Sequence, residues 1–316
     1  LLLPGRKEIG FLLLYTPTLV KHGLPVLAAI VRQIPVIVEI CEIRSKATGG
    51  SRRRNFGKYL DSFDVIMEWL IPRVARGIIP ISHGIEEYYR DRGIKNDDSY
   101  LLPILVDIEQ YARKSEAQVY ALSGKDYFLN SGSFAEKDGI DYVLDAFIKI
   151  ASSYPELYVV FTGDVAEKQK NAVKSRLLNA GIHSRVVFTG LLSREELVWA
   201  YQNARALLSC RTNSEYANYG FPTKIGEYLA SASPVIATRV GDIDSYLVDG
   251  DSAYLARAED VDSIAMCMRH VMGDTSKALQ VGKKGQEVAN KHFSYAQYSD
   301  SLAAFISEKL GPTRRH

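Results

Sequence analysis

The 316-residue chain has few cysteines, little net charge and no long apolar run. Its three cysteines, Cys41, Cys210 and Cys267, are scattered and form no C-x-x-C pair, which indicates a reducing compartment and argues against a cysteine-bound metal. A net charge of +2 does not favour nucleic acid as a partner. Pro17 and Pro35 break the apolar stretches well short of the ~20 residues of a membrane span. These absences favour a cytoplasmic protein that does not cross a bilayer.

Two common site signatures are also missing. No G-x-G-x-x-G motif follows an early strand with an acidic residue about 20 positions on, which disfavours a nicotinamide-dependent dehydrogenase. The histidines that have no acidic or cysteine partner at ligand spacing are His22, His183, His270 and His292. The sequence therefore predicts no metal site.

Short apolar segments alternate with amphipathic ones nearly throughout, which predicts an α/β protein with parallel sheets and helices on both faces. A polar segment at 109–123 separates two such units, and we place the boundary between residues 115 and 116. Strands of the first unit are expected at 11–15, 36–40, 77–81 and 101–102. Strands of the second are expected at 127–129, 158–161, 186–188, 206–208, 235–237 and 253–255.

The chain opens with Leu-Leu-Leu-Pro and no methionine. No charged segment precedes these apolar residues and no cleavage site follows them, so a secretory signal is not expected. The first unit also has room for only about four strands before the boundary. We therefore expect the first domain to lack its initial strands.

A strand, a glycine-containing loop and a helix follow one another over residues 127–147. Gly132 and Gly139 lie in the loop, and Lys137 places an ammonium group where a diphosphate could lie. The alternative is an ordinary solvated loop lysine. Asp138 is expected to cap the helix together with Asp141. The apolar face of this helix is predicted to comprise Ile140, Val143, Leu144, Phe147 and Ile148.

A second segment, residues 218–230, carries a turn at Gly220, followed by Pro222 at the expected first helical position. The free N–H groups at such a helix start can hold an anion. Thr223 and Glu227 are four residues apart and share a polar face. The opposite, apolar face is expected to contain Ile225 and Leu229.

Glu227 stands one turn into this helix, so close to an anion site that it is best explained as an acceptor for a sugar hydroxyl. The alternative is that Glu227 and Lys224 form an ordinary solvated helix face. The glycine-containing loop within residues 127–147 makes that alternative less favoured, because two separate segments then indicate the same kind of ligand.

These segments resemble the GT-B-fold glycosyltransferases, specifically the retaining enzymes of family 4, over roughly residues 36 to 310. Gly132 and Gly139 match the family's phosphate loop, and Glu227 matches its donor loop, which is followed by a strand at 234–238. The segment 188–193, with Leu191, resembles the one whose backbone contacts the nucleotide base. The resemblance implies two doubly wound Rossmann-like domains facing a cleft, at 1–115 and 116–292, with a helix at 293–316 that crosses back to the first domain.

The sequence departs from the family pattern at three places. Ser133 replaces the expected arginine, and Lys137 stands one position early, with Asp138 in the usual place of the lysine. The first glutamate of the family's donor-loop pair falls at Tyr219, with Glu215 the nearest carboxylate. Glu42 offers a carboxylate where many members have a histidine. We interpret these departures as features of a subgroup, with a catalytically inactive nucleotide-sugar-binding homologue as the alternative.

The resemblance implies transfer of a hexose from a nucleoside diphosphate sugar to an acceptor hydroxyl with retention, in polysaccharide or glycoconjugate assembly. The acceptor would be a saccharide or a lipid-linked molecule. No cofactor or metal would be required, since lysines and a helix dipole would offset the charge of the diphosphate. The implied catalytic residues are Lys137, Glu227 and Lys224. The implied donor-binding residues are Gly132, Ser133, Leu191, Gly220, Phe221, Pro222 and Thr223.

The basic run of Arg52, Arg53 and Arg54 offers a further contact. It could touch acidic lipid headgroups on the inner face of the membrane, although three charges would bind only weakly. A mobile loop is the alternative.

Overall fold

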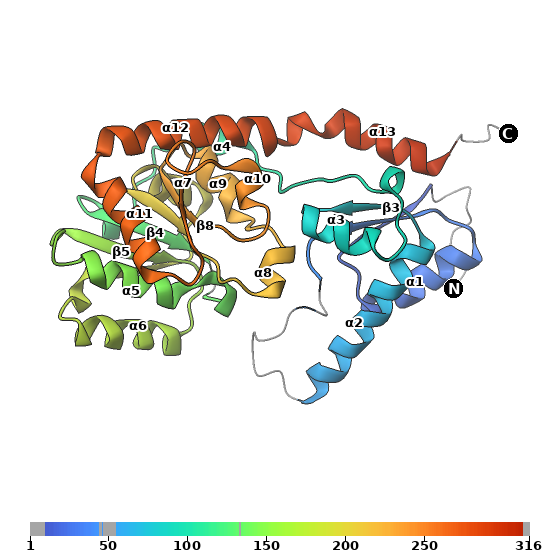
Figure 1. Cartoon of the computed structure of the whole chain (residues 1–316), viewed down its shortest axis with the longest axis horizontal. Coiled ribbons are helices and arrows are strands. Elements are labelled where there is room, and N and C mark those ends of the chain that lie inside the picture. The colour runs from blue at the N-terminus through green and yellow to red at the C-terminus, as the bar shows by residue number, and fades with distance from the viewer. Residues whose placement is uncertain (1–9, 44–45, 47–54, 133, 312–316) are drawn as a thin grey trace. The chain divides into compact units, whose positions relative to one another are not determined.

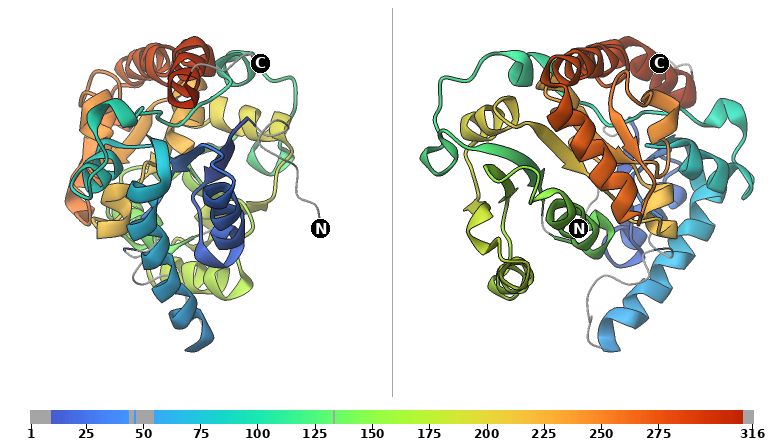
Figure 2. Two further views of the ribbon diagram at one scale, coloured as in Figure 1. Left: turned by 90° about the vertical axis from the view of Figure 1, so that its right-hand side faces the viewer. Right: turned by 60° about the vertical axis from the view of Figure 1, so that its left-hand side comes forward.

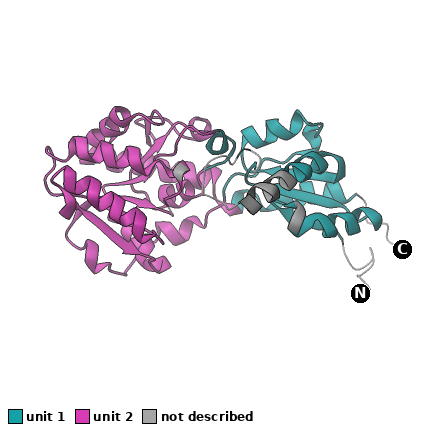
Figure 3. Ribbon diagram, turned by 90° about the horizontal axis from the view of Figure 1, so that it is seen from below, with its two compact units in different colours: residues 1–104, 215–221, 296–316 teal, residues 105–214, 222–295 magenta. Residues whose placement is uncertain are grey.

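The computed structural model describes residues 10–43, 46, 55–132 and 134–311 (Figure 1). The opening residues, the basic run at 52–54 and Ser133 lie outside the described residues. The chain divides into two compact units, coloured separately in Figure 3. Unit 1 comprises residues 1–104, 215–221 and 296–316, and unit 2 comprises residues 105–214 and 222–295.

Unit 1 is built on a parallel sheet with the strand order β1-β2-β3, comprising β1 (Leu12–Tyr15), β2 (Val36–Ile40) and β3 (Ala75–Pro80). Its helices are α1 (Leu19–Val31), α2 (Asn55–Val74), α3 (His83–Arg90), α8 (Glu215–Tyr219) and α13 (Ser299–Leu310), with a 3-10 turn at Asn96–Asp98. The predicted strands at 11–15, 36–40 and 77–81 are therefore present.

The predicted strand at 101–102 is wrong. Tyr100 N–H donates to the Ile78 carbonyl at 3.0 Å and Leu102 N–H to the Pro80 carbonyl at 2.9 Å, but this stretch forms an isolated bridge between Ile78 and Ser99 rather than a strand. The segment runs beside β3 and contributes an apolar side chain to the core of unit 1. Leu102 is buried in a small core with Ile37, Ile79 and Phe305.

Helix α13 packs directly onto β3. A Cβ atom built on Gly77 would come within 2.8 Å of the Phe305 ring, so the absence of a side chain at this position allows the close approach. Lys309 forms an ion pair with Asp98 at 3.2 Å. Residues 296–316 consequently belong to unit 1, whereas 293–295 belong to unit 2.

Unit 2 contains six parallel strands in the order β6-β5-β4-β7-β8-β9. All six strands predicted from the sequence are present: β4 (Asp126–Ser131), β5 (Leu157–Thr162), β6 (Val186–Gly190), β7 (Ala206–Ser209), β8 (Val235–Thr238) and β9 (Tyr254–Ala256). The chain order reverses between β4 and β7, so this is a doubly wound sheet.

The helices of unit 2 can be followed in Figure 2: α4 (Ile108–Ala112), α5 (Ile140–Ile150), α6 (Glu167–Asn179), α7 (Arg194–Gln202), α9 (Lys224–Ala230), α10 (Ile243–Tyr246), α11 (Val261–Gly273) and α12 (Thr275–His292). Right-handed crossovers put the helices that follow β4 and β5 on one face, and those that follow β7 and β8 on the other. Consistent with this, α5 packs against α11, and α9 packs against α12 and α4.

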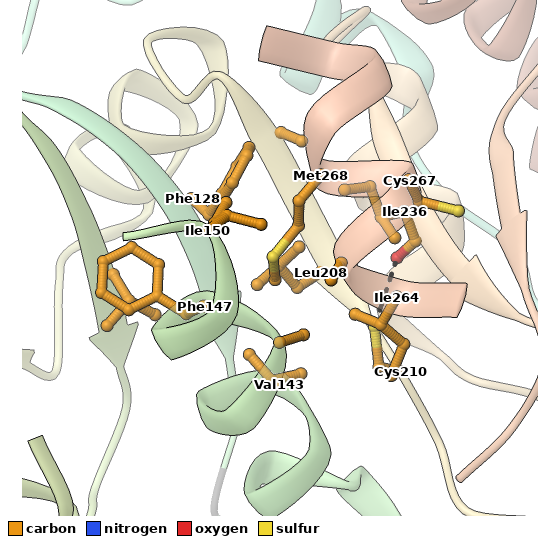
Figure 4. Close-up of a cluster of buried hydrophobic side chains, with 14 of the residues drawn as sticks. Phe128, Val143, Phe147, Ile150, Leu208, Cys210, Ile236, Ile264, Cys267 and Met268 are labelled. Atoms are coloured by element: carbon orange, nitrogen blue, oxygen red, sulfur yellow. Dashed lines mark hydrogen bonds between the residues drawn. The ribbon is translucent and has the colours of Figure 1, made fainter. Parts of the chain in front are cut away.

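The main core of unit 2 lies between α5, α11 and the sheet (Figure 4). On α5, Val143, Leu144 and Phe147 are fully buried, as the periodicity predicted, and Ile148 packs against the edge of the same cluster. Cys210 and Cys267 are free, buried thiols in this core. In this part of the molecule they act as small apolar side chains.

No helix in the described part of the chain combines the length and the apolar character of a membrane-spanning segment.

Candidate functional site

The reversal of strand order in unit 2 creates a place for a ligand. In doubly wound sheets the connections after the two strands at such a reversal run to opposite faces, and ligands commonly bind beyond the carboxyl ends of these strands. Gly132 directly follows β4, and the segment from Cys210 to Ser214 follows β7. The glycine-containing loop singled out in the sequence therefore begins at this edge.

The loop after β4 lies against the end of β7. Thr212 N–H donates to the Lys137 carbonyl at 3.0 Å. Gly139 has a φ of 61°, and a Cβ built on it would stand 2.0 Å from the Cys210 carbonyl oxygen. Both the left-handed backbone and the space at this position therefore require glycine.

The predicted capping role of Asp138 is wrong. The N-cap residue of α5 is Gly139, which makes no side-chain cap. The Asp138 carboxylate instead accepts a hydrogen bond from Ala135 N–H at 3.0 Å. The left-handed turn at Gly139 separates Asp138 from the helix start. The Asp138 side chain therefore closes the loop that carries Lys137.

Other contacts anchor the rest of this loop. Gly132 N–H donates to the Thr162 carbonyl at 3.0 Å, and the Gln169 side-chain amide donates to the Phe134 carbonyl at 2.9 Å. The Phe134 ring packs edge-on against Phe161 with centroids 4.7 Å apart. Lys137 is partly exposed in a 3-10 turn, Glu136–Asp138, held at both ends.

Helix α9 begins later than predicted. Its first residue is Lys224, its N-cap residue is Thr223, and Pro222 precedes the cap rather than occupying the first helical position. The reason is a tight turn in which Ile225 N–H donates to the Pro222 carbonyl at 3.0 Å. Because α9 has only seven residues, its dipole is small, and the Lys224 side chain supplies a full positive charge at the start of this helix.

The two faces of α9 divide as predicted. Ile225 and Leu229 are fully buried, whereas Thr223 is exposed and Glu227 is partly exposed. The Lys224 ammonium lies 3.2 Å and 3.4 Å from the two carboxylate oxygens of Glu227. This ion pair leaves 40% of the lysine side chain and 23% of the glutamate side chain exposed.

Two tyrosines that the sequence reasoning missed lie against Glu227. The Tyr201 hydroxyl on α7 is 3.4 Å from Glu227 Oε2, and the Tyr111 hydroxyl on α4 lies near the same carboxylate. Burial and the negative charge of Glu227 raise the pKa of Tyr111 to about 12, and burial raises the pKa of Tyr201. No local signal marks these residues, since both are far from Glu227 in the sequence.

Tyr228, the neighbour of Glu227, connects α9 to the end of β4. Its buried hydroxyl accepts a hydrogen bond from Ser131 N–H at 2.8 Å. Ser131 is the last residue of β4 and precedes Gly132. The strand that leads to Lys137 and the helix that carries Glu227 are therefore joined directly.

The boundary between the two units falls between Phe221 and Pro222, so Gly220 and Phe221 are assigned to unit 1 and the other predicted site residues to unit 2. They follow α8, whose Tyr216 hydroxyl donates to the Glu42 carboxylate. Glu215, the carboxylate nearest to the position of the family's first glutamate, forms an ion pair with Lys46 at 2.5 Å.

Leu191 follows β6 at the carboxyl edge of the unit 2 sheet, and its side chain is 79% exposed. Gly190, just before it, accepts a hydrogen bond from Gly163 N–H at 2.9 Å. No group of three or more His, Cys, Asp or Glu side chains among the described residues is arranged to hold a metal ion.

Comparison with known proteins identifies relatives of this chain. A model of the family described as glycosyl transferases group 1 matches residues 112–288. Mannosylfructose-phosphate synthase of Agrobacterium fabrum is 24% identical over 228 residues, which cover 68% of this chain and 49% of that protein. The GDP-mannose-dependent alpha-(1-6)-phosphatidylinositol monomannoside mannosyltransferase of Mycolicibacterium smegmatis is 22% identical over 213 residues, 65% of this chain and 55% of that one. The chain thus spans about half the length of these curated relatives.

Among solved structures, the HepE protein of Anabaena in complex with UDP and glucose superposes with a TM-score of 0.75. The sequence identity is 15%, and the match covers 94% of this chain and 78% of that chain.

Proposed function

Because the chain belongs to the glycosyl transferases of group 1 and has the GT-B fold, we propose that it transfers a hexose from a nucleoside diphosphate sugar to an acceptor hydroxyl with retention. The observation that carries this proposal is the carboxyl edge of the unit 2 sheet. There the Lys137 loop is bonded to the loop after β7, and α9 presents Lys224 beside Glu227. The UDP in the HepE complex and the GDP-mannose in the name of the mycobacterial relative support a nucleotide-sugar donor.

Different residues of this edge would contact different parts of the donor. Lys137 and Lys224 would lie against the diphosphate, where negative charge grows on the β-phosphate as the sugar departs. Interactions that strengthen with this charge lower the barrier. The leaving diphosphate would help to deprotonate the acceptor, so the chemistry asks little of side chains beyond charge stabilisation. No divalent metal is part of this proposal.

The remaining donor contacts are assigned to backbone and apolar groups. Gly132 and Ser133 would face the phosphates, and Leu191 would lie at the nucleotide base. Gly220, Phe221, Pro222 and Thr223 would complete the donor-binding set. Glu227 would accept hydrogen bonds from the ribose hydroxyls, because a carboxylate can accept but not donate them.

The acceptor in this proposal is a saccharide or a lipid-linked molecule in polysaccharide or glycoconjugate assembly. The enzyme would act in the cytoplasm, with peripheral contact to the inner face of the membrane where the acceptor is lipid-linked. Family membership excludes the nicotinamide-dependent dehydrogenase considered from the sequence.

Nucleoside diphosphates provide the direct test of the proposed donor site. In a thermal-shift screen of UDP, GDP, ADP and CDP, we expect at least one to stabilise the protein. A ligand at 100 times its Kd adds about 2.7 kcal/mol to the free energy of unfolding. The nucleotide that binds then selects the sugar donors for transfer and hydrolysis assays. No shift with any of the four would count against the function, and binding without turnover of any donor would indicate the inactive homologue.

Glu227→Gln is expected to raise the donor KM about ten- to a hundredfold with little change in kcat. A lost charged hydrogen bond of about 1.5 to 3 kcal/mol corresponds to this range. The ribose is remote from the reacting bond, so its contact is about equally strong in ground and transition states. The matched control is Glu195→Gln, the same change at an exposed residue in the first turn of α7. An unchanged donor KM in Glu227→Gln would refute the ribose role.

A further inference from the structure

The Glu227 carboxylate is approached by hydroxyl groups from two different elements. Tyr201 comes from α7 and Tyr111 from α4. The Tyr201 hydroxyl is 3.4 Å from the carboxylate that α9 carries, and the Tyr111 hydroxyl lies near it. The rings of Tyr111 and Tyr201 stack with centroids 6.3 Å apart and an interplanar angle of 19°. Tyr201 in turn packs edge-on against Tyr228 with centroids 5.0 Å apart. The three rings form a continuous aromatic row beside Glu227.

This row is rigid. Tyr201 is fully buried and Tyr111 is 7% exposed. The short helix α4 is held on α7 by the Gln202 amide, which donates to the Tyr111 and Arg113 carbonyls at 2.9 Å. The Arg194 side chain donates to the Gln110 side chain at 2.9 Å. The positions of both hydroxyls are therefore set by packing.

The two tyrosine hydroxyls can orient the Glu227 carboxylate by donating hydrogen bonds to it. A tyrosine hydroxyl is already protonated near neutral pH and burial raises both pKa values further, so each hydroxyl is available as a donor to the carboxylate. The 3.4 Å contact of Tyr201 is longer than the ~2.5–3.0 Å usual for O–H···O bonds, and such contacts often shorten when a ligand binds. A carboxylate has about four lone-pair positions, so two tyrosines and Lys224 still leave room for a ligand hydroxyl.

We propose that Tyr201 and Tyr111 are positioning residues that orient the Glu227 carboxylate toward the donor ribose and thereby set the discrimination between ribose and deoxyribose. The inference rests on the proposed function, because it takes the ribose as the partner of Glu227. A free glutamate side chain loses up to about 2 kcal/mol of rotamer entropy when it is fixed. The tyrosines fix the Glu227 side chain before the ligand binds. This preorganisation favours a ligand whose ribose hydroxyl donates a hydrogen bond to the carboxylate.

The experiment compares the Kd of a ribonucleotide with that of its 2′-deoxy form by calorimetry. The pairs are UDP with 2′-deoxy-UDP and GDP with 2′-deoxy-GDP, on the full chain. We expect the unmodified protein to prefer the ribonucleotide about tenfold. In Tyr201→Phe and Tyr111→Phe this preference should fall to about threefold or less, with the affinity for the deoxy form unchanged within twofold. Glu227→Gln should abolish the preference.

The control is Tyr127→Phe. It removes another buried tyrosine hydroxyl of unit 2, one that donates to the Ala200 carbonyl at 2.7 Å. It should leave the ribose preference intact. A merely structural role for Tyr201 and Tyr111 would weaken the ribose and deoxy forms equally, and that result would overturn the inference.

The outcomes also separate this inference from the proposed function. If no nucleotide binds the unmodified protein, the donor site itself is wrong and the inference falls with it. If Glu227→Gln loses the preference while both tyrosine variants keep it, the donor site stands and the positioning role is refuted.

Discussion

Replacing Lys137 by alanine is expected to lower kcat roughly 10²- to 10³-fold, the range found when one donor to a developing negative charge is removed. Donor affinity should fall as well, because the ammonium group would also contact the ground-state diphosphate. The loss in kcat distinguishes Lys137 from Glu227, since only an interaction that strengthens in the transition state changes turnover. Steady-state kinetics with saturating acceptor measure both constants.

Lys168→Ala provides the comparison for this variant. Lys168 is an exposed lysine in the first turn of α6, in the same unit, and its removal changes the net charge equally. We expect its kinetics to match those of the unmodified protein. A Lys137→Ala enzyme with unchanged kcat and donor KM would overturn the phosphate assignment.

Gly139→Ala is expected to destabilise unit 2 severely, by about 3 kcal/mol or more. An alanine in the left-handed region costs about 1–2 kcal/mol by itself. At Gly139, where φ is 61°, the new Cβ would also stand 2.0 Å from the Cys210 carbonyl oxygen, so the loop would have to move away from β7. That movement breaks the bond between Thr212 N–H and the Lys137 carbonyl, so nucleotide affinity should fall with stability. Denaturant unfolding and calorimetry would measure the two effects.

Gly181→Ala separates the two causes of destabilisation, the left-handed backbone and the lack of space for a side chain. Gly181 has a similar φ of 73°, but a Cβ built on it meets nothing within 4 Å. Its replacement should cost only the backbone term, about 1–2 kcal/mol, and should leave nucleotide affinity unchanged. Equal destabilisation by the two substitutions would show that the close approach to Cys210 does not matter.

Local pattern was sufficient for the elements of unit 2. All six strands were predictable because each is a short apolar run between polar turns, and the buried face of α5 followed from the spacing of Val143, Leu144 and Phe147. The strand expected at 101–102 was wrong for a nonlocal reason. An apolar, extended segment becomes a strand only where it forms a regular ladder with its neighbour, and here it makes two backbone bonds to β3 and an isolated bridge.

The ends of the helices were less predictable than their faces. Asp138 is a good capping residue by type, yet the left-handed turn at Gly139 moves it away from the start of α5. Pro222 suits a first helical position, yet a tight turn delays α9 to Lys224. In both cases the backbone conformation of one or two residues outweighed the statistical preference of the side chain.

The sequence by itself determined the alternation of strands and helices and the residue types of the Lys137 loop and of the segment that leads into α9. These features depend on periodicities and backbone preferences that act over a few neighbouring residues. Only the tertiary structure decided that Tyr111 and Tyr201 lie against Glu227, and that the Cys210 carbonyl leaves no space beside Gly139. Those contacts join residues far apart in the chain, and they exist because the strand order brings β4 beside β7 and packing brings α4, α7 and α9 together.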